Sequence, residues 1–190
     1  MEINNPNLRR KDMNHLHRIN EIISYVKPKM KVLDVGSSWF SMKDILPNNC
    51  EYVCIDLEDK PNTIKINLNK DKIPFPDNYF DIILIGEVIE HLVNFDNALN
   101  ELSRVGKKMV GSTPNAHSCR GIINHLIGRD TSIIKEHLVI WSKYELKNLL
   151  EIYFKEVEVY GHTIAIKNKC LHTGKTRFGD TLIFVCEGKK

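Results

Sequence analysis

The fold of this chain is decided by KVLDVGSS, residues 31–38. This short apolar run ends at an acid and a Gly-Ser turn, as a buried parallel strand does where it brings its backbone to a ligand. A second run, YVCI at residues 52–55, ends at Asp56 about twenty residues later. A carboxylate at that position can accept hydrogen bonds from both hydroxyls of a ribose. Together the two segments indicate a cofactor that contains a nucleoside.

Outside these two segments, the pattern of apolar residues alternates between helix and strand. Apolar positions recur at helical spacing in some segments and run continuously in others. This alternation favours an α/β fold with a doubly wound, mostly parallel sheet and helices on both faces. The predicted strands are 31–35, 52–56, 63–68, 81–85, 108–112, 156–160 and 181–187, and the predicted helices are 12–26, 38–46, 94–104, 117–127 and 142–153.

Polar residues and a glycine stand where several predicted strands leave the sheet. Asp34, Gly36, Asp56, Asn67 and Glu87 all lie at a strand end or just past it. In open α/β sheets, ligands bind beyond the carboxyl ends of the strands, where the strand order reverses. We therefore expect these residues to gather at one ligand site.

Composition limits the class of protein. The chain has 190 residues, 42% hydrophobic and 27% charged, with a net charge of +3, which predicts one globular domain over residues 1–190. It contains no apolar run long enough to span a bilayer and no apolar N-terminal signal segment. Its five cysteines are scattered without a Cys-x-x-Cys pair. We expect free thiols and a cytoplasmic location.

A succession of motifs resembles the class I S-adenosylmethionine-dependent methyltransferases, and in particular their ubiquinone-type, small-molecule branch. The resemblance is specific because the motifs follow the order and spacing of the family, from about residue 30 to the C-terminus. It implies a Rossmann-like, seven-stranded sheet whose last strand is antiparallel. The motifs are VLDVG at 32–36, ID at 55–56, IPFPDNYFD at 73–81, GEVIEHL at 86–92 and STPN at 112–115.

The resemblance also implies roles for individual residues around S-adenosylmethionine. The acid of the first strand is expected to orient the amino group of the cofactor, and the backbone of the loop 36–38 to approach its carboxylate. Asp56 is expected to bind the ribose hydroxyls. Asn67 stands where the family often has Asp, and its carbonyl oxygen can still accept from the exocyclic amine of adenine. The implied cofactor-binding residues are Asp34, Gly36, Ser37, Ser38, Asp56, Leu57, Asn67, Leu68 and Ile85.

The loop after the first strand departs from the family. It reads GSSWF at 36–40, where the family usually has Gly-x-Gly-x-Gly. Glycines let a backbone adopt positive φ and approach a ligand closely, whereas Trp39 and Phe40 are bulky. The alternative is a non-catalytic binding protein that retains the fold with a degraded pocket. Without the resemblance, Asp-x-Gly after a strand suits a nicotinamide cofactor equally, but the chain has no Gly-x-Gly-x-x-Gly.

A second group of candidate residues combines carboxylates and imidazoles. If a helical turn follows strand 81–85, then Glu87, Glu90 and His91 lie at i, i+3 and i+4 and share one face beside the cofactor. His137 precedes a helix and can fold over the same cleft. These four candidate catalytic residues suit a general base with an orienting acid, and His91 is the preferred base because imidazole titrates near neutral pH. They equally suit a divalent cation such as Mg²⁺, Mn²⁺ or Fe²⁺, or a structural pairing.

One function and two alternatives follow. We expect methyl transfer to an oxygen or nitrogen of a small or lipid-linked molecule, with a small-molecule acceptor as the partner. The alternative enzyme is a metal-assisted RNA 2′-O-methyltransferase, because that branch carries Glu-x-x-Glu-His and a later His before a Trp, with all four side chains on a metal. The alternative outside catalysis is the binding protein named above. Nucleic acid is the less favoured partner, since the chain shows no aromatic-interleaved RNA-binding pattern.

Three segments are predicted to select the acceptor. Residues 1–29 are expected to form a helical cap on a cofactor-binding core, 30–190, whose insertions near 116–141 and 162–180 lie on the substrate side. Both insertions carry Lys, Arg and His, which suit an anionic acceptor or form a solvated surface. A hairpin between the last two strands is the plainer interpretation of 162–180. The sequence leaves the oligomeric state open.

Overall fold

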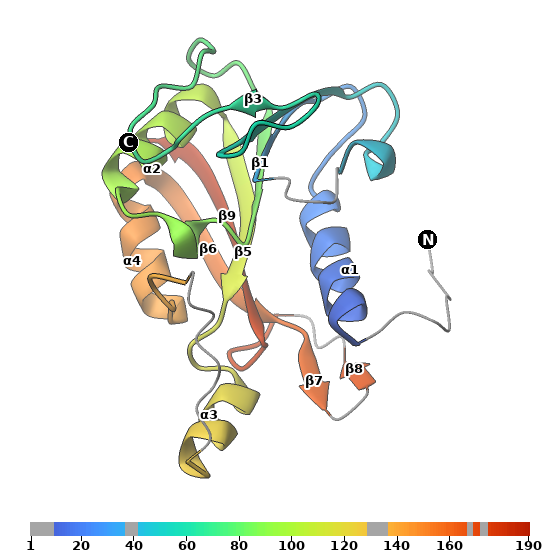
Figure 1. Ribbon diagram of the computed structural model, residues 1–190, viewed down its shortest axis with the longest axis vertical. Helices are drawn as coiled ribbons and strands as arrows, with labels where there is room; N and C mark the ends of the chain where they lie inside the picture. Colours follow the sequence, from blue (N-terminus) through green and yellow to red (C-terminus); the bar gives the residue numbers. More distant parts are fainter. Residues whose placement is uncertain (1–9, 37–41, 129–136, 167–168, 172–174) are drawn as a thin grey trace.

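A computed structural model describes residues 10–36, 42–128, 137–166, 169–171 and 175–190 (Figure 1). Its strands are β1 (Lys31–Val35), β2 (Glu51–Asp56), β3 (Ile64–Lys65), β4 (Ile82–Gly86), β5 (Lys108–Pro114), β6 (Phe154–His162), β7 (Ile164–Ile166), β8 (Lys169–Leu171) and β9 (Thr181–Lys189). Seven of these form one sheet in the order β3-β2-β1-β4-β5-β9-β6, and β7 pairs with β8 as a separate hairpin.

The order of the strands reverses between β1 and β4. From β1 the chain builds outward to β2 and β3, then returns to place β4 and β5 on the other side of β1, and these four pairings are parallel. The last strand, β9, is antiparallel to both of its neighbours, β5 and β6. This arrangement confirms the predicted doubly wound, Rossmann-like sheet with an antiparallel last strand. It also fixes a crevice at the carboxyl ends of β1 and β4.

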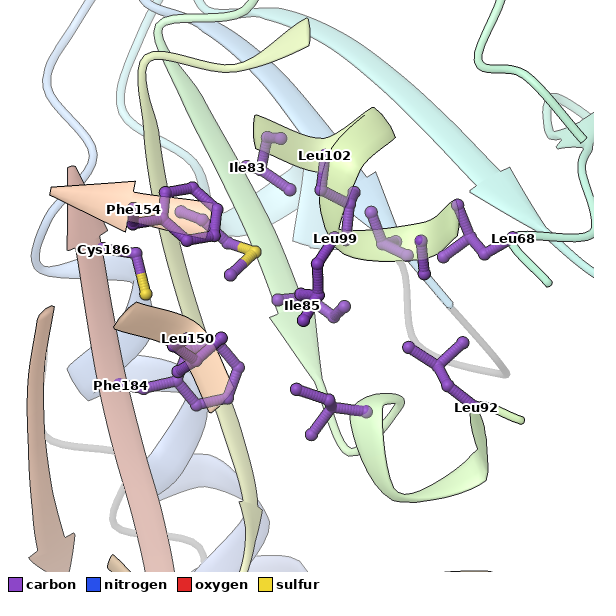
Figure 2. Close-up of a cluster of buried hydrophobic side chains, with 14 of the residues drawn as sticks. Leu68, Ile83, Ile85, Leu92, Leu99, Leu102, Leu150, Phe154, Phe184 and Cys186 are labelled. Carbon is purple, nitrogen blue, oxygen red and sulfur yellow. The ribbon is translucent and has the colours of Figure 1, made fainter. Parts of the chain in front are cut away.

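Helices cover both faces of the sheet, as predicted (Figure 1). Helices α2 (Phe95–Val105) and α4 (Lys143–Tyr153) pack on one face, where their leucines meet Phe184 of β9 in the larger core cluster (Figure 2). Helix α1 (Arg10–Ile23) packs on the other face, in a second cluster with Val32 and Leu84. Helix α3 (Cys119–Leu126) projects from one end of the molecule (Figure 1).

The central strands are apolar throughout because they lie between two cores. Leu33 of β1 enters the cluster under α2 and α4, whereas its neighbour Val32 enters the cluster under α1. The same alternation holds for β4, whose Ile83 and Leu84 enter opposite clusters. Burial on both faces therefore explains the continuous apolar runs from which these strands were predicted.

Helix α1 belongs to the core and is more than a cap. Its Ile19 and Ile22 are buried against the sheet, so the segment 1–29 supplies part of the second helical layer. Ile19 and Ile22 are spaced so that they lie on one side of the helix, and an apolar side of this kind lets an amphipathic helix pack on a sheet. Of the helices in the described part of the chain, none combines the length and the apolar character that a membrane crossing requires.

Two predicted elements differ from the structure. The strand expected over 63–68 is only the two-residue β3, because the chain turns at Asn67, whose carbonyl accepts from the amides of Lys70 and Asp71. The helix expected over 38–46 is described only as a 3₁₀ turn, Met42–Ile45, since 37–41 lie outside the described residues. The plainer interpretation of 162–180 is confirmed in its described part by the β7-β8 hairpin.

Candidate active site

A cavity of about 180 Å³ lies at the carboxyl ends of β1 and β2. Five of the residues predicted to bind the cofactor line it, from Gly36 at the end of β1 to Leu68 after β3. Its walls are mostly apolar, which suits the adenine ring of a nucleoside. The complete lining is Val35, Gly36, Ile55, Asp56, Leu57, Ile66, Asn67, Leu68, Asn69, Val88, His91 and Leu92.

Asp56 stands at the rim of this cavity with both carboxylate oxygens engaged. One oxygen accepts from the amide of Glu58 at 3.0 Å, and the other lies 3.2 Å from the ammonium of Lys60. The side chain keeps only 10% of its surface exposed. A ribose can therefore share this carboxylate with Lys60, and the position agrees with the ribose-binding role that the resemblance implies.

Gly36 has a backbone conformation and a close neighbour that leave no room for a side chain. Its φ is 76°, and a Cβ atom at this position would lie 2.4 Å from Cγ2 of Val88. Glycine alone adopts this region without strain and leaves the space free. The neighbouring residues predicted to approach the cofactor, Ser37 and Ser38, lie outside the described residues.

Asp34 and Ile85 are not among the residues that line the cavity. Ile85 is buried in the larger core cluster. The carboxylate of Asp34 accepts a 2.5 Å hydrogen bond from the hydroxyl of Tyr52, and it also accepts from the backbone amide of Met42. Burial raises the pKa of Asp34 to about 6, although these hydrogen bonds oppose the rise. A contact between Asp34 and the cofactor stays a prediction.

Glu87 does not share a helical face with Glu90 and His91, so the predicted i, i+3, i+4 arrangement is wrong. The 3₁₀ turn after β4 begins only at Ile89, and Glu87 before it has a left-handed φ of 57°. Its carboxylate turns toward β5 and α1. There it accepts from the hydroxyl of Ser112 at 3.1 Å and pairs with the guanidinium of Arg18 at 3.3 Å. A single positive φ thus separates Glu87 from the other candidates.

The other three candidate catalytic residues come together. Nε2 of His137 lies 4.0 Å from Oε1 of Glu90, and the imidazole rings of His91 and His137 meet edge to face with centroids 4.9 Å apart. The hydroxyl of Thr113 donates to Oε2 of Glu90 at 3.0 Å. The amide of Leu138 donates to the Glu90 carbonyl and holds the segment of His137 in place. The structure thus gathers a carboxylate and two imidazoles beside the cavity, since His91 also lines it.

Glu90 is the most strongly perturbed group of this cluster. It is fully buried, and burial raises its pKa to about 8, with the charge of Glu87 adding to the rise. Within the described residues, its Oε1 atom has no hydrogen-bond partner. A buried carboxyl with a free oxygen, in a cleft with two imidazoles, is typical of a functional site.

The donor atoms of the same cluster have nearly the spacing that a metal ion requires. One donor atom each from Glu90, His91 and His137 lies within 4.8 Å of the other two. Ligand atoms about 2.1 Å from a tetrahedral ion stand roughly 3.4 Å apart, so a small inward movement would suffice. The carboxylate and imidazole donors suit Mn²⁺, Fe²⁺ or Zn²⁺. Glu87, the fourth expected ligand, is outside this group.

Sequence reasoning missed several residues of the site. Thr113 lies within STPN, and its position on β5 beside β4 would have placed it near Glu90. Arg18 gave no signal, because an arginine on a predicted helix usually faces solvent. Asn69, which lines the cavity and accepts from the amides of Val93 and Asn94, lies just past the end that was predicted for the third strand.

Comparison with known proteins gives a consistent result. Residues 33–109 match a family model described as a methyltransferase domain. The ubiquinone/menaquinone biosynthesis C-methyltransferase UbiE of Shewanella oneidensis is 29% identical over an alignment of 104 residues, and the match covers 45% of this chain and 41% of that protein. The match thus spans less than half the length of this curated relative.

Two solved structures share the fold. A methyltransferase from Archaeoglobus fulgidus, described as S-adenosylmethionine-dependent, superposes with a TM-score of 0.65 at 18% identity and covers 94% of each chain. The small RNA methyltransferase HEN1 superposes with a TM-score of 0.68 at 14% identity, over 100% of this chain and 27% of its own. At these identities the likeness concerns the fold alone.

Proposed function

We propose that the chain is a class I S-adenosylmethionine-dependent methyltransferase and that it transfers a methyl group to an oxygen or nitrogen of a small or lipid-linked molecule. One observation supports this most directly. His91 lines the cofactor cavity and also belongs to the cluster with Glu90 and His137, so a proton acceptor stands beside the cofactor site. Bound S-adenosylmethionine supplies a methyl group that its sulfonium already activates, which leaves alignment and deprotonation to the protein.

The proposed role of His91 is to accept the proton of the acceptor hydroxyl or amine. Imidazole suits this role because its neutral form is present near physiological pH. Glu90 and His137 act as positioning residues, since they pack against His91 and Thr113 fixes the carboxyl of Glu90. Burial raises the pKa of Glu90 to about 8, and a positive charge that develops on the imidazoles would favour the ionised form of its carboxyl.

Exposed apolar side chains near the cluster support an apolar acceptor. Leu138, whose amide bonds to Glu90, is 58% exposed, and Val93, which follows the cavity residue Leu92, is 72% exposed. Leu57 is exposed at the cavity itself. An apolar rim around a site with few polar groups favours an aromatic or lipid-tailed molecule over a highly charged one.

Calorimetric titration with S-adenosylhomocysteine tests the cofactor site. We expect micromolar binding by the wild type. A flat trace at millimolar ligand would contradict the proposal and would leave the non-catalytic binding protein as the better interpretation.

Methyl transfer from tritiated S-adenosylmethionine to phenols and amines, with and without an alkyl tail, tests the reaction. We expect His91→Ala to lower kcat by about 100-fold or more with nearly unchanged affinity for S-adenosylhomocysteine. The exposed His117, replaced by alanine, is the matched control. Product with the methyl group on carbon would contradict the proposed oxygen or nitrogen acceptor.

A second candidate is the metal-assisted RNA 2′-O-methyltransferase, which the grouping of Glu90, His91 and His137 favours. A divalent ion held by these residues would act as a Lewis acid on the acceptor hydroxyl. Calorimetry with Mn²⁺ separates the two candidates. Binding of one Mn²⁺ by the wild type, with loss in His91→Ala, would favour the metal enzyme. Equal behaviour of the two proteins would rule it out.

A further inference from the structure

Helix α3 presents an apolar stripe to solvent. Ile123 and Leu126 are 57% and 78% exposed, and Ile127, in the turn after the helix, is 56% exposed. These residues stand at i, i+3 and i+4, so they lie side by side on one face. Single exposed apolar residues are common on soluble proteins, whereas a contiguous stripe marks an interaction surface.

Two exposed aromatic residues lie on the body of the protein near the start of α3. The amide of Cys119 donates to the backbone carbonyl of the half-exposed Phe178 at 3.2 Å, which places the start of α3 beside this residue. The guanidinium of Arg177, the residue before Phe178, donates to the hydroxyl of the exposed Tyr144 at 2.9 Å, which holds Tyr144 near the same segment. We call these residues together the apolar patch: Ile123, Leu126, Ile127, Tyr144 and Phe178.

A basic hollow of about 300 Å³ adjoins the apolar patch at Arg177. Val157 and Val159 of β6 line it, together with four cationic side chains and one acid, Glu158, which pairs with Lys175. Lys147 pairs with Glu151 at 3.5 Å. Across the described part of the chain, Lys143 and Arg177 have no carboxylate partner. The hollow therefore carries net positive charge. Its cations are Lys143, Lys147, Lys175 and Arg177.

We propose that the apolar patch and the basic hollow together dock on an anionic phospholipid bilayer. Apolar side chains of an amphipathic helix enter the boundary between headgroups and acyl chains, and neighbouring cations meet the lipid phosphates. Charge argues against a second copy of this chain as the occupant. A two-fold pairing through the apolar patch would bring two positive hollows close together.

The place of α3 in the fold agrees with this orientation. It projects from the end of the sheet toward which the β5 arrow points (Figure 1). Parallel strands present their ligand sites at that end. Docking would therefore bring the substrate side toward the bilayer, where a lipid-linked acceptor resides. The inference goes beyond the proposed function and does not rest on it, because binding to lipid requires no catalysis.

Flotation of the full chain with vesicles tests the proposal. One set of vesicles is pure phosphatidylcholine, and the other contains added phosphatidylglycerol. We expect the wild type to float with the anionic vesicles only, and less of it at high salt, because salt screens the basic hollow. S-adenosylhomocysteine binding, measured on the same preparation, shows separately whether the proposed function holds.

Two variants test the two parts of the surface. Leu126→Asp should lower partitioning by about tenfold or more, because it places a charge on the apolar patch. Its matched control is Ile152→Asp, an apolar position at the far end of α4 that is 62% exposed. Lys143→Glu should lower partitioning about 25-fold, at roughly fivefold for each unit of charge. Lys155→Glu, an exposed lysine at the start of β6, is its control. Circular dichroism of every variant checks folding.

Several results would overturn the proposal. One is that the wild type floats with neither set of vesicles, and a second is that it floats equally well with neutral vesicles. The third such result is that both Leu126→Asp and Lys143→Glu partition like the wild type. A dimer in sedimentation that Leu126→Asp dissociates, without lipid binding, would assign the apolar patch to a second copy. Binding of a short RNA that Lys143→Glu abolishes, without lipid binding, would assign the basic hollow to nucleic acid.

Discussion

The proposed cofactor side and the proposed acceptor side of the cleft, called below the cofactor side and the acceptor side, are assembled in different ways. On the cofactor side, Gly36, Asp56 and Asn67 follow three strands that are consecutive in the chain and neighbours in the sheet. On the acceptor side, Glu90 meets Thr113 of β5 and His137 from the segment before α4. Local motifs therefore define the first site, whereas long-range packing defines the second.

The two sides also differ in the hydrogen bonds that their carboxyl groups make. Both oxygens of Asp56 are engaged by Glu58 and Lys60 at the rim. Glu90 is fully buried, and within the described residues its Oε1 atom has no hydrogen-bond partner. A carboxylate held ready for a ribose needs only to be positioned, but one that supports proton transfer gains from a buried site that alters its pKa.

Replacing Glu90 should give the largest effect that separates the two sides. We expect Glu90→Gln to lower kcat by about 100- to 1000-fold, because the amide keeps the shape but cannot ionise when an imidazole becomes charged. The affinity for S-adenosylhomocysteine should change by less than about threefold. Steady-state kinetics and calorimetry measure the two quantities, with the exposed Glu156→Gln on β6 as control. Parallel losses in both would show that the two sides are not separable.

This contrast explains how much the sequence could predict. The seven strands of the large sheet, and the position of Gly36, Asp56 and Asn67 at one cavity, follow from apolar runs and strand-end motifs, whose geometry is local. Sequence spacing could not show that Glu87 turns toward Arg18, because this depends on one left-handed residue. Nor could it join the hydroxyl of Thr113 to Glu90. The apolar patch was missed for a related reason, since helical spacing does not reveal whether an apolar stripe is covered.

Asp34 offers a test on the cofactor side through pH. Burial raises its pKa from 3.8 to about 6, so the folded state binds the proton more tightly than the unfolded chain does. The resulting stability is full below pH 3.8 and is lost as the pH rises through about 6. The free energy of unfolding of the wild type, relative to Asp34→Asn, should therefore fall by up to about 3 kcal/mol across this window.

Urea unfolding at pH values on either side of the window measures this difference. The exposed Asp59→Asn serves as the matched control, and its difference from the wild type should change little with pH. A constant difference for Asp34→Asn as well would mean that folding leaves the proton affinity of this carboxyl unaltered, contrary to the burial argument.

Replacing Asp56 should give a smaller effect, and it should change cofactor affinity, whereas replacing Glu90 should change kcat. We expect Asp56→Ala to weaken binding of S-adenosylhomocysteine about 30-fold, as loss of charge-assisted hydrogen bonds to the ribose predicts. At saturating cofactor, kcat should stay within a few-fold of the wild type. Lys60→Ala is the informative companion, since Lys60 contacts the same carboxylate at 3.2 Å. If Asp56→Ala binds S-adenosylhomocysteine as tightly as the wild type does, the ribose does not contact Asp56.

The smallest expected effect concerns Arg18, whose ion pair with Glu87 joins α1 to the end of β4. It is carried by α1 on the second face of the sheet, yet its guanidinium pairs with Glu87 at the end of β4. Both side chains are partly exposed, so the pair contributes only modestly to stability. We expect Arg18→Ala to lower kcat by roughly two- to fivefold and the free energy of unfolding by about 1 kcal/mol or less.

The result for Arg18 decides how far the acceptor side extends. Lys27→Ala, an exposed lysine just past α1, is the control for a lost surface charge. A lower kcat with unchanged cofactor affinity would place α1 on the acceptor side, because Glu87 adds to the electrostatic environment of Glu90. A loss of stability alone would confine α1 to packing. In that case the acceptor side would consist only of segments on the α2 and α4 face, and the contrast between the two sides would become sharper.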